Sequence, residues 1–425
     1  MPQIVLPTLH AAQAAIRRHP AKFKAIRCGR RFGKSEMLIE EACNDAAQGA
    51  FVGLFFPGYK YQTEIFHRII DILLPIKRTS NRTEGVYRTK TGGRLDFWSL
   101  DNEDCGRSRK YHKIHIDECS LKKGLGMVDI WEQSIKPTLL DYDGEARIYG
   151  TPKGVNDENF FYRACHLTEL GFINFHAPTW TNPHLSRAAV DRLRAEYPPL
   201  VFAQEFGAEF VDWSGDQFFN VDNMLAGGLG HDMPPFCDYV FAVIDTANKS
   251  GKEHDGTGVM YFALQKYGGK LTLYVLDYDL VQIDGAFLET WLPTIYQNLE
   301  SLAVECRSQL GSAGVFIEDK ASGIILLQQA RAKNCMAEPI DSKLTLLGKD
   351  ERAINISGKV FQGLVKITKR AVNRIVNFKQ VSKNHMISQI KAFRPGDKDA
   401  YKRADDLLDC FCYGVAIALG NTEGY

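Results

Sequence analysis

The stretch "IRCGRRFGKSEML", residues 26–38, is the most informative part of the chain. It contains Gly33, Lys34 and Ser35, which match the last three positions of the phosphate-binding P-loop pattern G-x-x-x-x-G-K-[ST]. That pattern asks for a glycine where this chain has Cys28, and the nearest glycine comes one residue later. The stretch is therefore a damaged P-loop, a chance match or a variant P-loop, and its surroundings must decide.

The sequence on either side has the context that a P-loop requires. The run "FKAIRCG" (23–29) predicts a strand, and "KSEMLIEEACNDAAQ" (34–48) predicts a helix. At a helix N-terminus, backbone N–H groups surround phosphates, while the lysine reaches the β and γ oxygens and the serine holds magnesium. We therefore expect Gly33, Lys34 and Ser35 to bind ATP.

Further strands and helices follow through the first half of the chain. Strands that alternate with helices predict an α/β domain with a mainly parallel sheet, which we place at residues 1–211. The expected elements are a strand at 51–57, a helix at 61–74, a hairpin at 86–98 and strands at 111–117 and 146–152.

The run "YHKIHIDE" (111–118) supplies the acids that an ATP site needs. Asp117 would hold magnesium through water, and Glu118 would orient the attacking water. The simpler interpretation is a strand that ends in two solvated acids. Strand geometry points Lys113 and His115 to the same side, and we expect these two residues at a sheet edge or interface rather than as ligands.

Two weaker signals accompany the acidic pair. Gln13 lies upstream of the loop, where many ATPases place a glutamine that reads adenine. Thr151 and Pro152 end a predicted strand, where a polar residue can sense the γ-phosphate and move the segment that follows. Taken alone, Thr151 and Pro152 indicate a plain turn.

The pattern breaks at "DWSGDQFFNVDNMLAGGLGHDMPP" (212–235), and we place a linker at 212–236. A second α/β domain is expected at 237–425. Its expected elements are adjacent strands at 239–247, 256–264 and 270–278, a fourth strand at 314–321 and an apolar helix at 404–419.

Acidic residues occur at three places in this second series. Asp245 ends the first strand, Glu318 ends the fourth, and Asp405, Asp406 and Asp409 open the last helix. Nucleases of the RNase H type need acids from separate strands and a helix to hold two divalent metals. Oxygen ligands suit magnesium or manganese, so the pattern predicts a metal-dependent nuclease.

Each acid also has a structural explanation. Asp245 could cap a turn, Asp319 competes with Glu318 for the strand-end role, and acids in a first helical turn favour the helix dipole. On the last helix, Asp409 neighbours both Asp405 and Asp406. The side chains of Asp405 and Asp406 point in directions about 100° apart around the helix axis. We expect Asp406 to accompany Asp409, and Asp405 to face solvent or the basic segment described next.

Composition limits the remaining possibilities. Apolar residues make up 45% and charged residues 24% of the chain, which is typical of a globular protein. Neither a membrane-length apolar run nor a signal peptide is evident, and ten scattered cysteines predict reduced thiols. Net charge is +1, but residues 359–403 hold twelve Lys or Arg against Asp397 and Asp399. That basic segment is either a solvated surface or a phosphate-binding face.

Three stretches in order, "GRRFGKS", "IHIDE" and "WEQSIKPTLLDYDGEARIYGTPKGVN", resemble the large terminase subunit of tailed bacteriophages. The resemblance extends from about residue 9 to about residue 420. In that family an arginine just before Gly-Lys-Ser/Thr is usual, so Arg30 is expected to add a phosphate contact. The resemblance implies a RecA-like (ASCE) P-loop ATPase domain followed by an RNase H-like nuclease domain.

The resemblance also implies ligands and partners. It aligns Asp245, Glu318 and Asp409 with the metal ligands of the nuclease, with Asp255 and Asp406 accessory. ATP and Mg²⁺ or Mn²⁺, two ions in the nuclease site, are the expected cofactors. The expected partners are double-stranded DNA, the portal protein of an empty capsid, a small terminase subunit and further copies of the chain in a pentameric ring. Such a protein would act in the host cytoplasm and transiently on the procapsid, and would be missing from the mature virion.

The function that the resemblance implies is ATP-driven translocation of double-stranded DNA into an empty capsid, with metal-dependent cutting of concatemeric DNA. Two other functions compete with it. A helicase-nuclease of DNA repair or defence would need a second RecA-like domain, and residues 155–211 are too short for one. A non-enzymatic DNA-binding scaffold would not need complete ATP and metal sites. Which arginine would act on a neighbour's ATP stays open among Arg94, Arg107 and Arg109.

Overall fold

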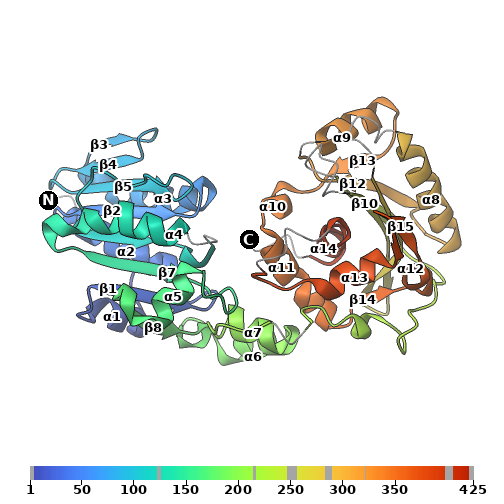
Figure 1. The fold of residues 1–425 in the computed structure, drawn as a ribbon, viewed down its shortest axis with the longest axis horizontal. Coiled ribbons are helices and arrows are strands. Elements are labelled where there is room, and N and C mark those ends of the chain that lie inside the picture. The colour runs from blue at the N-terminus through green and yellow to red at the C-terminus, as the bar shows by residue number, and fades with distance from the viewer. Residues whose placement is uncertain are drawn as a thin grey trace. The chain divides into compact units, whose positions relative to one another are not determined.

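The computed structural model describes residues 4–121, 126–213, 217–246, 256–282, 290–320, 322–397 and 405–420. The chain divides into two compact units, drawn in Figure 1. The first unit comprises Met1–Arg194 and Pro199–Asp212, and the second comprises Ala195–Pro198 and Trp213–Tyr425.

The first unit is built on an eight-stranded sheet with the order β3-β4-β5-β2-β6-β7-β1-β8. The strands from β5 to β8 run parallel, and β3 and β4 extend the sheet as an antiparallel edge. The strands are β1 Phe23–Cys28, β2 Phe51–Phe56, β3 Lys77–Asn81, β4 Val86–Thr89, β5 Arg94–Ser99, β6 Lys113–Ile116, β7 Glu145–Gly150 and β8 Ile173–Ala177. The helices are α1 Ala11–Arg18, α2 Lys34–Ala47, α3 Tyr59–Leu73, α4 Gly126–Asp129, α5 Phe160–His166 and α7 Pro199–Glu205, with α6 Arg187–Glu196 at the boundary between the units.

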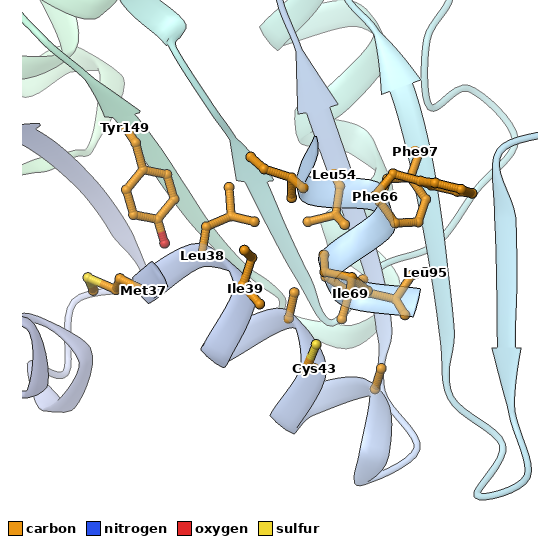
Figure 2. Close-up of a cluster of buried hydrophobic side chains, with 14 of the residues drawn as sticks. Met37, Leu38, Ile39, Cys43, Leu54, Phe66, Ile69, Leu95, Phe97 and Tyr149 are labelled. Carbon is orange, nitrogen blue, oxygen red and sulfur yellow. The ribbon is translucent and has the colours of Figure 1, made fainter. Parts of the chain in front are cut away.

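Helices cover both faces of this sheet because its central strands are apolar on both sides. Figure 2 shows α2 and α3 packed over one face, with Leu38 and Ile69 lying against Leu54 and Leu95 of the strands. On the other face, α5 and the aromatic ring of Trp131 bury a second cluster. The rigid sheet fixes where the loops at the carboxyl ends of the strands begin.

The position of β6 corrects one sequence prediction. This strand pairs with β2 on one side and β7 on the other, so it lies inside the sheet. His115 is fully buried, with Nδ1 3.1 Å from the hydroxyl of Tyr149, and Lys113 forms an ion pair of 2.8 Å with Asp45 of α2. The expectation of an edge or interface was wrong. Asp45 of α2 pairs with Lys113, and Tyr149 of β7 contacts His115 Nδ1, while His115 Nε2 is buried with no hydrogen-bond partner among the described residues.

The second unit contains a six-stranded sheet with the order β13-β12-β9-β10-β11-β14. The predicted adjacent strands β9, β10 and β11 are antiparallel neighbours, and β12 pairs with β9 in parallel. The strands are β9 Tyr239–Asp245, β10 Thr257–Tyr267, β11 Lys270–Val281, β12 Ser312–Ile317, β13 Ala337–Pro339 and β14 Val365–Ile367, with a hairpin of β15 Val376–Phe378 and β16 Val381–Lys383. The helices are α8 Leu292–Glu305, α9 Ser322–Ala332, α10 Ser342–Thr345, α11 Lys349–Phe361, α12 Lys369–Asn373, α13 His385–Ala392 and α14 Asp406–Leu419.

Helix α14 is the buried centre of this unit. It packs on β9, β10 and β11, and α11 and α13 pack against it in turn. The helix is apolar on nearly all sides, as expected for a helix enclosed on every face. Gly414 is required where α14 meets β10, because a Cβ there would lie 2.1 Å from the ring of Phe262. Its close packing fixes the rotation of the helix and hence the direction of its acidic first turn.

The segment placed as a linker at 212–236 differs from that expectation where the structure describes it. From Trp213 onward the chain belongs to the second unit. Phe218 and Phe219 are buried, and the ring of Phe219 lies 5.6 Å from that of Phe411 on α14. Local Gly and Pro content hides this packing because the aromatic residues make their contacts with a distant helix.

Two further observations concern the whole described chain. No helix in the described ranges is long and apolar enough to cross a membrane. All ten cysteines are free thiols, in agreement with the prediction of reduced side chains.

Candidate nucleotide and metal sites

The P-loop connects β1 to α2, as its flanking sequence predicted. Cys28 ends β1 and is fully buried in the core. The first glycine occupies position 29 because a Cβ there would lie 2.3 Å from the carbonyl oxygen of Phe206. Gly33 caps α2 with a φ of 95°, in the left-handed region that favours glycine. The displaced first glycine is therefore a feature of how this loop packs and not a damaged motif.

Gln13 braces this loop from α1. Its Nε2 donates to the carbonyl of Gly33 at 2.8 Å, and its Oε1 accepts from the backbone N–H of His10 at 2.9 Å. A Cβ at position 33 would come within 2.6 Å of the same Nε2. The structure thus places Gln13 at the loop, while its contact with adenine stays a prediction.

The predicted residues of the ATP site meet at the carboxyl edge of the sheet. The strands β6, β7 and β1 are parallel neighbours, so Asp117, Thr151 and the P-loop follow adjacent strand ends. Lys34 Nζ lies 2.5 Å from Glu118 Oε1. Ser35 follows in the first turn of α2. This is the edge where ligands bind in open α/β sheets.

Asp117 and Glu118 have different environments. Asp117 is buried, and its Oδ1 has no hydrogen-bond partner among the described residues. Burial and the neighbouring Glu118 raise the pKa of Asp117 to about 7, against the opposing effect of Lys34. Glu118 has a φ of 45°, and its side chain pairs with Lys34. A buried carboxylate in need of a cation fits magnesium coordination through water.

Glu205, at the end of α7, was missed by the sequence analysis. Its side chain is 1% exposed, and its Oε2 accepts from Arg30 Nε at 2.7 Å while its Oε1 lies 3.3 Å from Lys153 Nζ. The backbone N–H of Arg30 also donates to the Glu205 carbonyl at 2.7 Å. Burial alone would raise the pKa of Glu205, but Lys153 and Arg30 lower it to about 2. Arg30 is thus held beside the loop, and its phosphate contact stays a prediction.

The predicted acids of the second unit converge. Asp245 ends β9, Glu318 directly follows β12, and Asp406 and Asp409 lie in the first turn of α14. These four residues are 6–8% exposed. Burial raises the pKa of Asp245 well above its usual range, and Asp409, Glu318 and Asp406 add to the effect. Four buried carboxylates together are unfavourable without positive charge, so this oxygen set fits divalent metals.

The alternatives left open by the sequence differ in exposure. Asp319 is exposed, whereas Glu318 is buried. The side chain of Asp405 is 33% exposed and pairs with Lys349, which lies outside the basic segment 359–403. Asp255 lies outside the described residues. The geometry therefore favours Glu318 and Asp409 over Asp319 and Asp405 as ligands.

Basic side chains interleave the acids, and the sequence analysis missed them. Arg352 of α11 lies 2.9 Å from Asp409 Oδ1 and 4.0 Å from Glu318 Oε1. Lys320 Nζ lies 2.6 Å from Glu318 Oε1, and the hydroxyl of Tyr413 donates to the same oxygen at 3.1 Å. Across the described ranges, no three His, Cys, Asp or Glu side chains stand in a ready-made metal geometry. The carboxylates of Glu318 and Asp409 instead contact these neighbouring donors.

The three candidate trans-acting arginines all have acidic partners. Arg94 lies 2.7 Å from Asp96 Oδ1, and Arg109 lies 3.5 Å from Asp96 Oδ2. Arg107 lies 2.8 Å from Asp104. These contacts hold the side chains in place but do not rank them for a role on a neighbouring subunit.

No protein-family model matches the chain. The sequence is 27% identical over 257 residues to the terminase large subunit of Thermus phage G20c, a match that covers 51% of each chain. The terminase large subunit of Thermus virus P23-45 matches with the same identity, 27% over 257 residues, and the same coverage of 51%. The chain therefore spans about half the length of these two relatives.

The fold is shared along nearly the whole chain. A structure of the large terminase from a thermophilic bacteriophage superposes with a TM-score of 0.64 at 13% identity, covering 97% of this chain and 99% of that one. A second structure of that terminase, in complex with ADP, gives a TM-score of 0.63 at the same coverage. These similarities confirm the predicted fold class and the resemblance on which it rested.

Proposed function

We infer that the chain belongs to the large terminase family, because its sequence is similar to terminase large subunits and its fold is that of a large terminase. On this premise we propose that the first unit is an ATPase that moves double-stranded DNA into an empty capsid. We propose that the second unit is a nuclease that cuts the concatemer. The observation that carries the proposal is the presence, in one chain, of a P-loop lysine paired with Glu118 and a separate cluster of four buried acids.

In the ATP site, the chain supplies binding, orientation and a base. Lys34 pairs with Glu118, and the β and γ oxygens of ATP would take Lys34 in place of that carboxylate. Glu118 would then be released to orient the attacking water. Magnesium, held by Ser35 and by Asp117 through water, would supply neutralisation of the phosphate charge.

The segment after β7 is the proposed route from nucleotide to DNA movement. Thr151 is buried at the same sheet edge as Asp117, so a γ-phosphate could contact it. Lys153 and the backbone N–H of Gly154 are tied to Glu205 and Gln204 of α7. The same carboxylate holds Arg30. A change in the phosphates bound at the P-loop would therefore be transmitted through these contacts to α7.

In the nuclease site, the acids come from two strand ends and one helix. Asp245, Glu318 and Asp409, with Asp406 accessory, would hold two divalent ions, which activate water and stabilise the leaving oxygen in phosphodiester cleavage. Tyr413 and Lys320 hold the carboxylate of Glu318 in place. The proposed ligands are all carboxylate oxygens, which suit both Mg²⁺ and Mn²⁺.

The proposed partners follow from the family. DNA phosphates would meet the basic segment 359–403, which carries no base-reading pattern. A pentameric ring of subunits on the portal of a procapsid and a small terminase subunit complete the motor that we propose. Its place of action would be the host cytoplasm. A helicase-nuclease is not favoured, because the second unit has an antiparallel β9–β10–β11 core in place of a second RecA-like sheet.

Packaging of linear duplex DNA tests the proposed function. Purified empty capsids that carry a portal, ATP and the full chain are expected to protect DNA from added nuclease. The same mixture with Lys34→Ala is expected to protect none. Unwinding of duplex DNA by the chain, with no protection of DNA in capsids, would support the helicase-nuclease instead.

A further inference from the structure

The acid cluster of the second unit contains its own buried cation. Arg352 lies on the first turns of α11, which packs directly against α14. Its side chain is only 11% exposed. A buried guanidinium is costly unless charged partners surround it, and here the partners are the proposed metal ligands themselves.

Arg352 reaches two of the four acids at once. Its Nη2 lies 2.9 Å from Asp409 Oδ1, and its Nη1 lies 4.0 Å from Glu318 Oε1. Nη1 also donates to the hydroxyl of Tyr413, which passes a hydrogen bond of 3.1 Å to Glu318. The Cζ atom of the guanidinium lies 4.7 Å from the centre of the Tyr413 ring. These contacts tie Arg352 to one acid from β12 and one from α14.

The other cations near the cluster lie at its rim. The side chain of Lys320 is 46% exposed and shares its ammonium between Glu318 and the carbonyl of Thr345. Lys349 pairs with Asp405, and its distance to Asp409 is 3.8 Å. Water can replace an exposed ammonium at little cost. Arg352 is therefore the cation whose position matters most to the buried acids.

We propose that Arg352 is an internal counter-ion that competes with divalent metal for Asp409 and Glu318. This proposal rests on the proposed nuclease function of the same cluster and adds a regulation to it. Without metal, the guanidinium keeps the buried carboxylates from repelling one another. Metal ions need the same oxygens, so binding of either cation weakens the other. The contact sets the metal concentration at which the site loads.

Binding of Mn²⁺ to the full chain without nucleotide tests the competition. The free ion is measured by electron paramagnetic resonance for wild type, Arg352→Gln and Arg352→Lys. Arg370→Gln is the matched control, since Arg370 pairs with Asp277 and Glu305 elsewhere in this unit. Arg352→Gln is expected to bind Mn²⁺ about tenfold more tightly, within the usual range of coupling between two sites. Arg352→Lys and the control are expected to stay within about twofold of wild type.

Two results would overturn the proposal. Unchanged affinity in Arg352→Gln would show that the guanidinium does not compete. Weaker affinity would show that Arg352 positions the acids for metal and does not oppose it. If wild type binds Mn²⁺ and cuts DNA in either case, the nuclease function stands and only the counter-ion role falls. If wild type binds no Mn²⁺ at all, the nuclease function and the counter-ion role both fall.

Thermal unfolding separates a counter-ion from a packing role. Without metal, Arg352→Gln is expected to melt below wild type, and saturating Mn²⁺ is expected to close most of the gap, because a ligand that binds more tightly stabilises more. A gap of equal size with and without Mn²⁺ would contradict the proposal. If the single variant does not fold, the double variant Asp409→Asn, Arg352→Gln is expected to fold, because it removes both charges of the pair. Failure of both to fold would assign Arg352 to packing.

Discussion

A single buried residue can pair with charged groups that are far away in the sequence, and Glu205 is the clearest case. Its carboxylate binds Arg30, 175 positions away, and Lys153. Two cations on separate loops therefore share one buried anion. A buried charge that loses its partner destabilises a protein far more than an exposed one. Glu205 thus links the P-loop to the segment after β7.

Replacing Glu205 by Gln is expected to lower the free energy of unfolding of the first unit by about 3 kcal/mol at pH 7. The pKa of Glu205 is lowered to about 2 in the folded chain. Its stabilisation is therefore complete above the unfolded pKa of roughly 4.3 and is lost as pH falls toward 2. Urea unfolding at about pH 7 and about pH 3 checks whether the difference between variant and wild type narrows at the lower pH.

Glu36→Gln is the control for that comparison. Glu36 binds Arg68 through two short contacts, but both side chains are more than a third exposed. Loss of this ion pair is expected to lower the free energy of unfolding by less than about 1 kcal/mol. Equal losses for Glu36→Gln and Glu205→Gln would contradict the buried role of Glu205.

Glu118→Gln is expected to separate nucleotide binding from hydrolysis. The amide keeps the size of the side chain but is a poor base, so hydrolysis should slow by roughly 10²–10⁴-fold. ATP binding should persist or tighten, because Lys34 loses a competing carboxylate. Binding of a fluorescent ATP analogue and steady-state turnover measure the two quantities. Loss of binding would instead make Glu118 a structural residue.

At the level of elements, α14 decides which acids face the metal site. The helix is enclosed by β9, β10, β11, α11 and α13, so its rotation is fixed. Asp409 lies inside, where it contacts Arg352. Asp405 precedes the helix, and its side chain is 33% exposed beside Lys349.

Asp409→Asn is therefore expected to abolish cutting of DNA in both Mg²⁺ and Mn²⁺ while ATP hydrolysis continues. Asp405→Asn is expected to keep cutting within about tenfold of wild type, because it changes only a rim ion pair. Supercoiled plasmid relaxation and linearisation measure both. An inactive Asp405→Asn together with an active Asp409→Asn would place the helix in the wrong rotation.

The sequence predicted elements well because their signals are local. Apolar periodicity placed β1, α2, β9 and α14 within a few residues of their observed bounds. Strand order is a long-range property, so the central position of β6 was missed and His115 was placed wrongly at an edge.

The candidate sites were predictable only in their motif residues. Acids at strand ends, such as Asp245 and Glu318, have a positional signal. Arg352 and Glu205 have none, because a single charge on a helix usually faces solvent. Only the folded chain shows that these two are buried among partners.

On the scale of the whole molecule, the boundary between the units predicts which fragments fold. The long continuous part of the second unit begins at Trp213, whose ring packs 5.2 Å from that of Phe218. A fragment of residues 213–425 is expected to fold and to cut DNA with Mn²⁺. A fragment of residues 237–425 loses the buried Phe219 and Met224. It is expected to melt at least about 5 °C lower, because each of several lost aromatic contacts is worth roughly 0.5–1.5 kcal/mol.

Circular dichroism and cutting assays on the two fragments test that boundary. Equal melting temperatures would show that residues 213–236 contribute nothing to the fold. A folded 213–425 fragment that cuts no DNA in any divalent metal would count against the nuclease itself.

The most direct test of two separate chemistries in one chain is a pair of full-length variants measured in both assays. Lys34→Ala is expected to lose ATP hydrolysis and keep metal-dependent cutting, whereas Asp245→Asn should lose cutting and keep ATP hydrolysis. The reason is that Lys34 belongs to the first unit and Asp245 to the second. The account is contradicted if Lys34→Ala hydrolyses ATP at near the wild-type rate, or if Asp245→Asn still cuts DNA.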